Sequence, residues 1–120
     1  MIMIILSYTQ KGIFMKPIRK VAIIGGVRTP FIKSFSNYLG ISNQEMMTTT
    51  LQKLVEKYNL KGKLLGDVAL GAVMTHPSDW GMARECVLGT TLHPNTSAYN
   101  LQRACGTSLE AANQIALKIA

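Results

Sequence analysis

Cysteines, aromatic residues and acidic residues are all scarce in this sequence of 120 residues. Two cysteines are too few for a disulfide framework, so we expect Cys86 and Cys105 to be free thiols. Lysine and arginine outnumber aspartate and glutamate 13 to 6, but they are scattered and lack the interleaved aromatics of a nucleic-acid-binding surface. We therefore interpret the net charge of +7 as solvated surface charge, with attraction of an anionic substrate as the alternative.

The sequence also lacks a hydrophobic run long enough to span a membrane. Its apolar opening, MIMIIL, is shorter than a signal-peptide core and has neither the charged flank nor the cleavage site. We expect residues 1–15 to be an N-terminal extension, disordered or arising from an upstream start codon, and residues 16–120 to form the domain. We expect a cytoplasmic protein, with an organelle matrix as the alternative.

Motifs for metals, nucleotides and serine hydrolases are missing too. The sequence contains no metal-ligand cluster, P-loop, G-x-G-x-x-G or serine-hydrolase elbow. His76 and His93 each precede a proline in a polar loop, and we assign them no catalytic role. We therefore expect neither a metal nor a bound cofactor.

Hydrophobic patterns predict three strands that alternate with helices. The unbroken apolar run Val21–Ile24 is typical of a strand buried on both faces. Within Ser42–Tyr58, Ser42 and Glu45 have capping-box spacing ahead of one apolar helix face, and Gly62 follows as a stop signal.

The middle of the chain predicts a second strand and helix. Asp67–Met74 reads as a buried strand, and a short helix over about Met82–Leu88 follows, with Ser78 or Asp79 as its cap. Cys86 has apolar neighbours and is expected to pack inside this helix.

Cys105 lies between a β-prone run and the last predicted helix. Ser97–Leu101 suits a short strand, and Gly106, Thr107 and Ser108 provide the flexibility and capping groups of a sharp turn. At a helix start, a thiol meets unpaired N–H groups and the positive end of the helix dipole, which favour the thiolate. Cys105 is therefore the candidate nucleophile.

The order of these elements predicts an α/β fold. Strands alternating with helices form parallel sheets, so we expect Val21–Ile24 and Ser97–Leu101 to lie parallel in one sheet. The last helix should turn one face inward, and part of its apolar surface should remain uncovered. The expected inward positions are Leu109, Ala112, Ala116 and Ile119.

Three motifs, VAIIGGVRTPF, MARECVLG and ACGTSLEAA, resemble in order and spacing the N-terminal part of a thiolase. In that family, a turn of the form N-x-x-C-x-S-G carries the cysteine that becomes acylated; here Gln102 stands where the pattern has asparagine. The resemblance covers residues 16–120 and implies a thiolase-like βαβαβα half-domain with a mainly parallel sheet, truncated relative to a whole thiolase.

The resemblance also implies a function. A thiolase transfers acyl groups between coenzyme A (CoA) thioesters, by 3-ketoacyl-CoA thiolysis or acetyl-CoA condensation, and works as a homodimer or tetramer when full length. Cys105 would be the acyl-thioester nucleophile, with its backbone N–H directed to the oxyanion, and acyl-CoA and CoA would be the partners. The family's activating histidine and acid/base cysteine lie in later motifs, so we expect these 120 residues to be inactive alone.

Three alternatives stay open at this point. A β-ketoacyl synthase-like condensing enzyme has a similar cysteine turn, but the early R-T-P-F motif argues against it. A non-catalytic dimerisation fragment is favoured by the missing acid/base residues. A small basic binding protein is disfavoured by the scattered charge.

Overall fold

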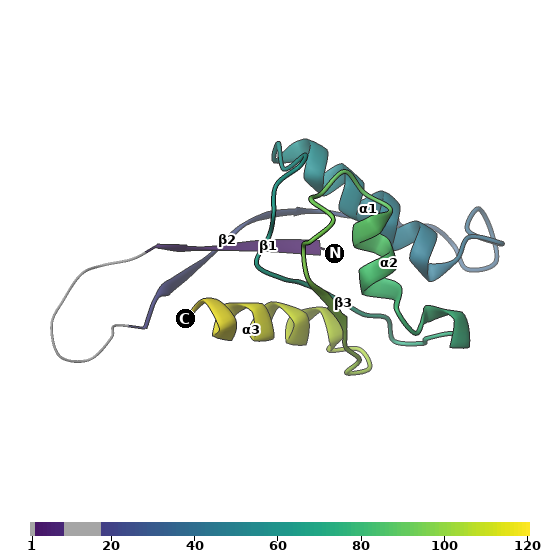
Figure 1. The fold of residues 1–120 in the computed structure, drawn as a ribbon. Helices are drawn as coiled ribbons and strands as arrows, with labels where there is room; N and C mark the ends of the chain where they lie inside the picture. The colour runs from purple at the N-terminus through teal and green to yellow at the C-terminus, as the bar shows by residue number, and fades with distance from the viewer. Residues whose placement is uncertain (1, 9–17) are drawn as a thin grey trace, which may run out of the picture.

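The computed structural model of the chain describes residues 2–8 and 18–120, which form two small sheets and three α-helices (Figure 1). The elements in chain order are β1 (Ile2–Tyr8), β2 (Lys20–Val27), α1 (Asn43–Lys57), β3 (Val68–Leu70), the 3-10 turn η1 (Pro77–Asp79), α2 (Met82–Leu88), β4 (Ala98–Asn100) and α3 (Thr107–Ile119). β1 pairs antiparallel with β2, and β3 pairs in parallel with β4. No helix in the described ranges is long and apolar enough to cross a membrane.

The expectation of one parallel sheet is only partly met. The pair β3–β4 is parallel and is joined through α2, as in a βαβ unit. The run Val21–Ile24, however, lies in β2 and belongs to a different sheet from β4, so that part of the prediction is wrong. The physical reason is that β1, an apolar segment close in sequence, takes β2 as its partner and forms an antiparallel ribbon at low closure cost.

β1 comes from the segment that was expected to be an extension outside the domain. Its register with β2 runs from Ile2 opposite Val27 to Tyr8 opposite Lys20, with an irregularity after Ile4. Residue 1 and residues 9–15 of that expected extension lie outside the described residues. The boundary at residue 16 stays a prediction.

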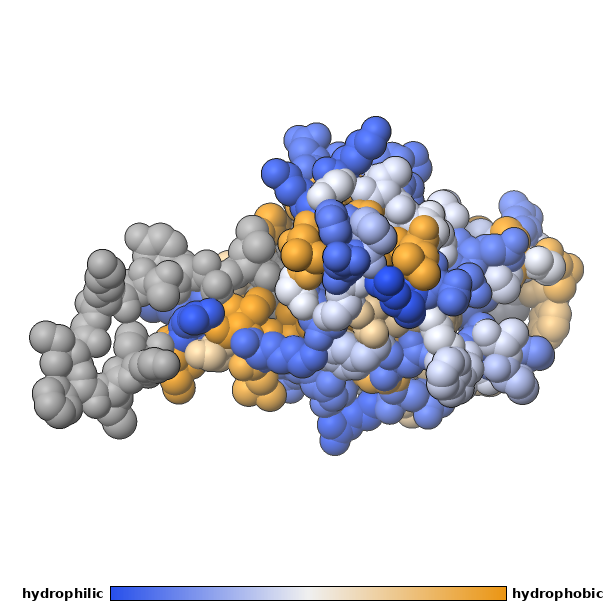
Figure 2. Space-filling view, in the orientation of Figure 1, coloured by the Kyte–Doolittle hydropathy of each residue, from blue (hydrophilic) through white to orange (hydrophobic). Residues whose placement is uncertain are grey.

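β2 is not buried on both faces, contrary to the sequence analysis. The side chains of Ile23 and Ile24 are 68% and 45% exposed. α1 packs against β1 and β2, and α3 packs against β1, yet these contacts leave both isoleucines open to solvent in the described structure. Hydrophobic residues accordingly gather on the surface around the β1–β2 hairpin and the end of α3 (Figure 2).

The start of α1 has the predicted capping box. Ser42 Oγ accepts a hydrogen bond from the Glu45 N–H at 3.1 Å, and Glu45 Oε2 accepts one from the Ser42 N–H at 2.8 Å. The end of the helix differs from the prediction. Asn59, with φ of 53°, takes the left-handed position directly after the C-cap Tyr58, whereas Gly62, with φ of 70°, serves the following turn.

The hydrophobic core lies between α1, α2 and β3. Cys86 on α2 has no exposed surface, as expected for a buried thiol. The core residues are Leu51, Leu54, Val55, Val68, Leu70, Met82, Ala83, Cys86, Val87 and Leu92.

α2 begins and ends where the sequence predicted, but its expected caps are wrong. Its N-cap is Gly81, which makes no side-chain capping bond. The Asp79 carboxylate is occupied in η1 instead, where Oδ2 accepts hydrogen bonds from the His76 N–H at 2.9 Å and from Asn43 Nδ2 at 3.0 Å. These two bonds, with that from His76 first, hold the pKa of Asp79 below its usual range.

α3 buries less apolar surface than predicted. Leu109 was expected to face inward but is 73% exposed, and Leu117 is 74% exposed. Ala112, Ala116 and Ile119 are half-buried. The helix packs against β1 and β3 and leaves apolar side chains uncovered within the described structure, as the sequence analysis expected.

Candidate active site

The candidate nucleophile lies in the turn between β4 and α3. β4 ends at Asn100, the chain crosses to α3 over residues 101–106, and α3 begins at Thr107. Cys105 lies two residues before the helix, and its side chain is exposed. The predicted strand, turn and helix are therefore present around the thiol, with a strand that is shorter than expected.

The turn contains a strained backbone position directly before the cysteine. Ala104 has φ of 42°, in the left-handed region that alanine rarely adopts. Such a position costs on the order of 1–3 kcal/mol, so the surrounding structure must hold it in place. Two backbone bonds close the turn, from the Gly106 N–H to Arg103 O at 2.9 Å and from the Thr107 N–H to Ala104 O at 3.2 Å.

Thr107 adds side-chain bonds to the same turn. Its Oγ1 accepts a hydrogen bond from the Arg103 N–H at 2.9 Å and donates one to Ala104 O at 2.7 Å. The residue is only 5% exposed. The sequence places Thr107 among the capping groups of the helix, but the N-cap is Gly106 without a side-chain bond, and the threonine hydroxyl closes the preceding turn instead.

The segment before the turn is fastened to the neighbouring strand and its loop. The Leu101 N–H donates to Leu70 O at 2.9 Å, which extends the parallel pairing beyond β4. Gln102 Nε2 donates to Val73 O at 2.6 Å. The position where the family pattern has asparagine thus holds a side chain that ties the cysteine turn to the loop after β3.

Asn100 fastens the end of β4 to the start of α2. Its Oδ1 accepts a hydrogen bond from the Ala83 N–H at 2.7 Å, and its Nδ2 donates to Asp79 O at 2.9 Å and Trp80 O at 2.7 Å. Anchoring roles for Asn100, Gln102 and Thr107 do not follow from the sequence motifs. The available signal was polar side chains within and beside a β-prone run, which hydrogen bond to backbone groups when a strand end meets loops.

Gly71 allows the close approach between β3 and the cysteine turn. A Cβ at this position would collide with the Leu101 carbonyl oxygen and would lie 2.6 Å from Thr107 Cγ2. Gly71 falls inside the predicted strand Asp67–Met74, where a glycine ordinarily weakens the strand. The structure shows that glycine is needed there because the backbone of the next segment occupies the space of a side chain.

Charged groups near the turn are paired with each other. Arg103 Nη1 lies 2.7 Å from Glu110 Oε2. Hydrogen bonds from Gln114 and then from Arg103 lower the pKa of Glu110, so this carboxylate stays ionised at neutral pH. Further along α3, Lys118 pairs with Asp67 and lies 4.2 Å from the centre of the Tyr99 ring.

The other nucleophilic or basic side chains have local structural roles. Cys86 Sγ lies 3.6 Å from Gln44 O, and burial raises the pKa of this thiol. His76 Nδ1 lies 2.8 Å from Ser78 Oγ, and His93 Nδ1 accepts from the Asn95 N–H at 3.1 Å. In the part of the chain that the structure describes, no three His, Cys, Asp or Glu residues gather as metal ligands.

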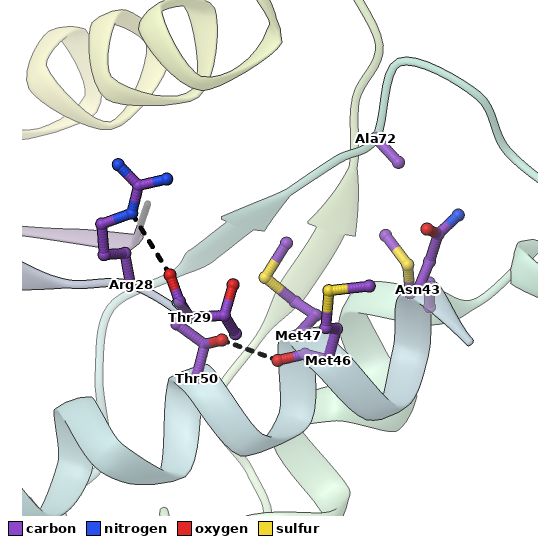
Figure 3. A pocket seen from close by; sticks show the side chains of 8 residues that line it. Arg28, Thr29, Asn43, Met46, Met47, Thr50 and Ala72 are labelled. Carbon is purple, nitrogen blue, oxygen red and sulfur yellow. Dashed lines mark hydrogen bonds between the residues drawn. The ribbon is translucent and has the colours of Figure 1, made fainter. Parts of the chain in front are cut away.

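A pocket of about 330 Å³ lies beside α1 (Figure 3). Cys105 does not line it. Arg28, at its rim, donates from Nε to Thr29 O at 3.3 Å and stacks 5.0 Å from the Phe31 ring centre, so it holds its own loop. The lining residues are Arg28, Thr29, Asn43, Met46, Met47, Thr50, Ala72 and Met82.

Comparisons with known proteins match the segment that carries the cysteine turn. The family described as "Thiolase, N-terminal domain" matches residues 21–120. Proteins named 3-ketoacyl-CoA thiolase from Shewanella denitrificans, Photobacterium profundum and Shewanella baltica are 36%, 34% and 36% identical over 100 residues. Each comparison covers 83% of this chain and 23% of the relative, so the chain spans less than a quarter of these relatives' length. The chain belongs to the thiolase N-terminal domain family.

Proposed function

We propose that this chain supplies the acyl-accepting cysteine of a thiolase and that Cys105 is that residue. The observation that carries the proposal is an exposed thiol on a strained turn directly before α3, inside the segment that matches the thiolase family. The relatives' name points to 3-ketoacyl-CoA thioesters as substrates. Thiolysis of these esters and the reverse condensation of acetyl-CoA use the same acyl-cysteine.

The proposed step is a thioester exchange. The Cys105 thiolate attacks the thioester carbonyl carbon, and the tetrahedral intermediate collapses by breaking the bond to the CoA sulfur. CoA leaves as a thiolate and takes up the proton that Cys105 gave to solvent, so charge and atoms balance. A thioester on cysteine has nearly the energy of the substrate thioester, so the transfer runs in both directions.

The oxyanion of the tetrahedral intermediate needs hydrogen-bond donors. We propose that the backbone N–H of Cys105 supplies one of them, because a nucleophile on a sharp turn carries its own amide close to the developing charge. Removal of one such donor in other enzymes costs about 3 kcal/mol of transition-state stabilisation. The left-handed Ala104 directly before Cys105 sets the direction of this amide.

Completion of the catalytic cycle requires groups beyond Cys105. The resemblance places the activating histidine and the acid/base cysteine in motifs that these 120 residues do not contain. The chain alone is therefore expected to be inactive as a thiolase, and we propose that it accepts one acyl group without turnover. This step has CoA as the leaving group and needs no metal or cofactor. Exposed apolar side chains on β2 and α3 support association with another subunit, as a homodimer or tetramer, and we propose a cytoplasmic setting.

Incubation of the purified chain with acetyl-CoA tests this proposal. We expect one acetyl group per chain and an equal amount of released CoA, followed by no further CoA release. Intact-protein mass spectrometry and a thiol assay measure the two quantities. Failure to acquire an acetyl group would contradict acyl acceptance and favour the non-catalytic dimerisation alternative, and continued turnover would contradict the need for further groups.

A further inference from the structure

We propose that Thr107 is a positioning residue for Cys105, because its buried hydroxyl holds the left-handed turn that presents the thiol. The inference rests on the proposed role of Cys105. It assigns to Thr107 a function in the site that differs from ordinary helix capping, since the helix N-cap is Gly106.

The two hydrogen bonds of the Thr107 hydroxyl span the cysteine. The acceptor bond comes from the N–H of Arg103, and the donor bond goes to the carbonyl of Ala104. These are the two residues immediately before Cys105, whereas Thr107 is the second residue after it. One hydroxyl group therefore ties the chain on both sides of the thiol.

The same bonds act on the strained position. The carbonyl that accepts from Thr107 Oγ1 belongs to Ala104, the residue with φ of 42°. Alanine has no side-chain group of its own that could stabilise this conformation, unlike asparagine or aspartate. Without the hydroxyl, the two backbone bonds from Gly106 and Thr107 and the exposed bond from Arg103 to Glu110 would remain. Relaxation of Ala104 to an ordinary φ would then be opposed less strongly, and it would turn Cys105 in another direction.

The two branches of the threonine side chain have separate roles. Its methyl carbon, Cγ2, faces Gly71 at the junction with β3, whereas Oγ1 faces the turn. Valine has the same branched shape as threonine but cannot form the hydrogen bonds, and serine keeps the hydroxyl but lacks the methyl group. The pair Thr107→Val and Thr107→Ser therefore distinguishes hydrogen bonding from packing.

The control is a second buried threonine whose hydroxyl also binds a backbone N–H. Thr96 is completely buried, and its Oγ1 accepts a hydrogen bond from the Leu65 N–H at 3.2 Å. Thr96→Val removes a comparable buried bond outside the cysteine turn. This variant shows how much a general loss of stability changes the alkylation rate of Cys105.

The test measures the alkylation rate of Cys105 by iodoacetamide in the 120-residue chain, together with the Cα and Cβ chemical shifts of Ala104. We expect Thr107→Val to lower the rate by about fivefold or more, the factor that corresponds to the net contribution of one typical hydrogen bond. The same variant should shift Ala104 away from left-handed values. Thr107→Ser and Thr96→Val should keep the parental rate and shifts.

A further variant keeps the test decisive if Thr107→Val does not fold. Glycine adopts the left-handed conformation without strain, so Ala104→Gly combined with Thr107→Val should restore folding and most of the alkylation rate. A parental rate in Thr107→Val, an equal loss in Thr107→Ser or Thr96→Val, or no recovery in the double variant would overturn the inference. If acetyl-CoA did not acetylate the parent chain, that result would contradict the proposed function but not the role of Thr107. The alkylation comparison does not depend on acetylation.

Discussion

Replacement of Cys105 by serine is expected to abolish acyl incorporation from acetyl-CoA while leaving the fold intact. The hydroxyl of serine is a far weaker nucleophile than a thiolate, and an ester would not return its acyl group to CoA as readily as a thioester. The side chain is exposed, so its loss should change the free energy of unfolding by less than about 0.5 kcal/mol. Intact mass after incubation with acetyl-CoA, combined with urea unfolding, measures both effects.

Cys86→Ser is the matched control, because it makes the same chemical change at a buried thiol. Burying a hydroxyl at this fully enclosed position is expected to cost about 1–3 kcal/mol of stability. Acetylation should stay at one group per chain under conditions in which the variant is folded. Acetylation of the Cys105→Ser protein, or its loss in folded Cys86→Ser, would contradict the assignment of the nucleophile.

Gly71→Ala is expected to produce the largest loss of stability, about 3 kcal/mol, because the added methyl group has no space. It would collide with the Leu101 carbonyl oxygen, which is backbone, and with Thr107 Cγ2. The chain would have to separate the end of β3 from the cysteine turn. Urea unfolding followed by circular dichroism measures the loss, and slower alkylation of Cys105 should accompany it.

Gly66→Ala provides the matched control for this substitution. Among the residues that the structure describes, no atom beyond Gly66 and its two chain neighbours lies within 4 Å of a Cβ built at Gly66, so the added methyl group has space. The change should lie within about 0.5 kcal/mol of the parent, since alanine also reduces the entropy of the unfolded chain. Equal stability of the two alanine variants would show that the contact between β3 and the cysteine turn does not support the fold.

The features that the sequence predicted correctly depend on neighbouring residues. The capping box of Ser42 and Glu45 needs only one helical turn, and the bounds of α2 follow from a short apolar period. The burial of Cys86 follows from its apolar neighbours on the same helix. Each of these features is set by a few neighbouring residues, so it does not depend on how distant segments pack.

The features that the sequence did not predict depend on distant segments. The exposure of Ile23 depends on which other elements pack against β2. The sheet that β2 joins depends on whether β1 or β3 is its hydrogen-bonding partner. The apolar pattern of the strand predicts neither its partner nor its exposure. The anchoring by Asn100 and Thr107 and the strain at Ala104 likewise arise where β3, β4 and α3 meet.

Limited alkylation of the folded chain by iodoacetamide at neutral pH, followed by peptide mass mapping, tests the central claim most directly. Burial excludes reagent from Cys86 and raises the pKa of its thiol, whereas Cys105 is exposed on the turn before α3. The account predicts that the peptide containing Cys105 is labelled first and that Cys86 is labelled only after unfolding. Equal labelling of both cysteines, or faster labelling of Cys86, would contradict it.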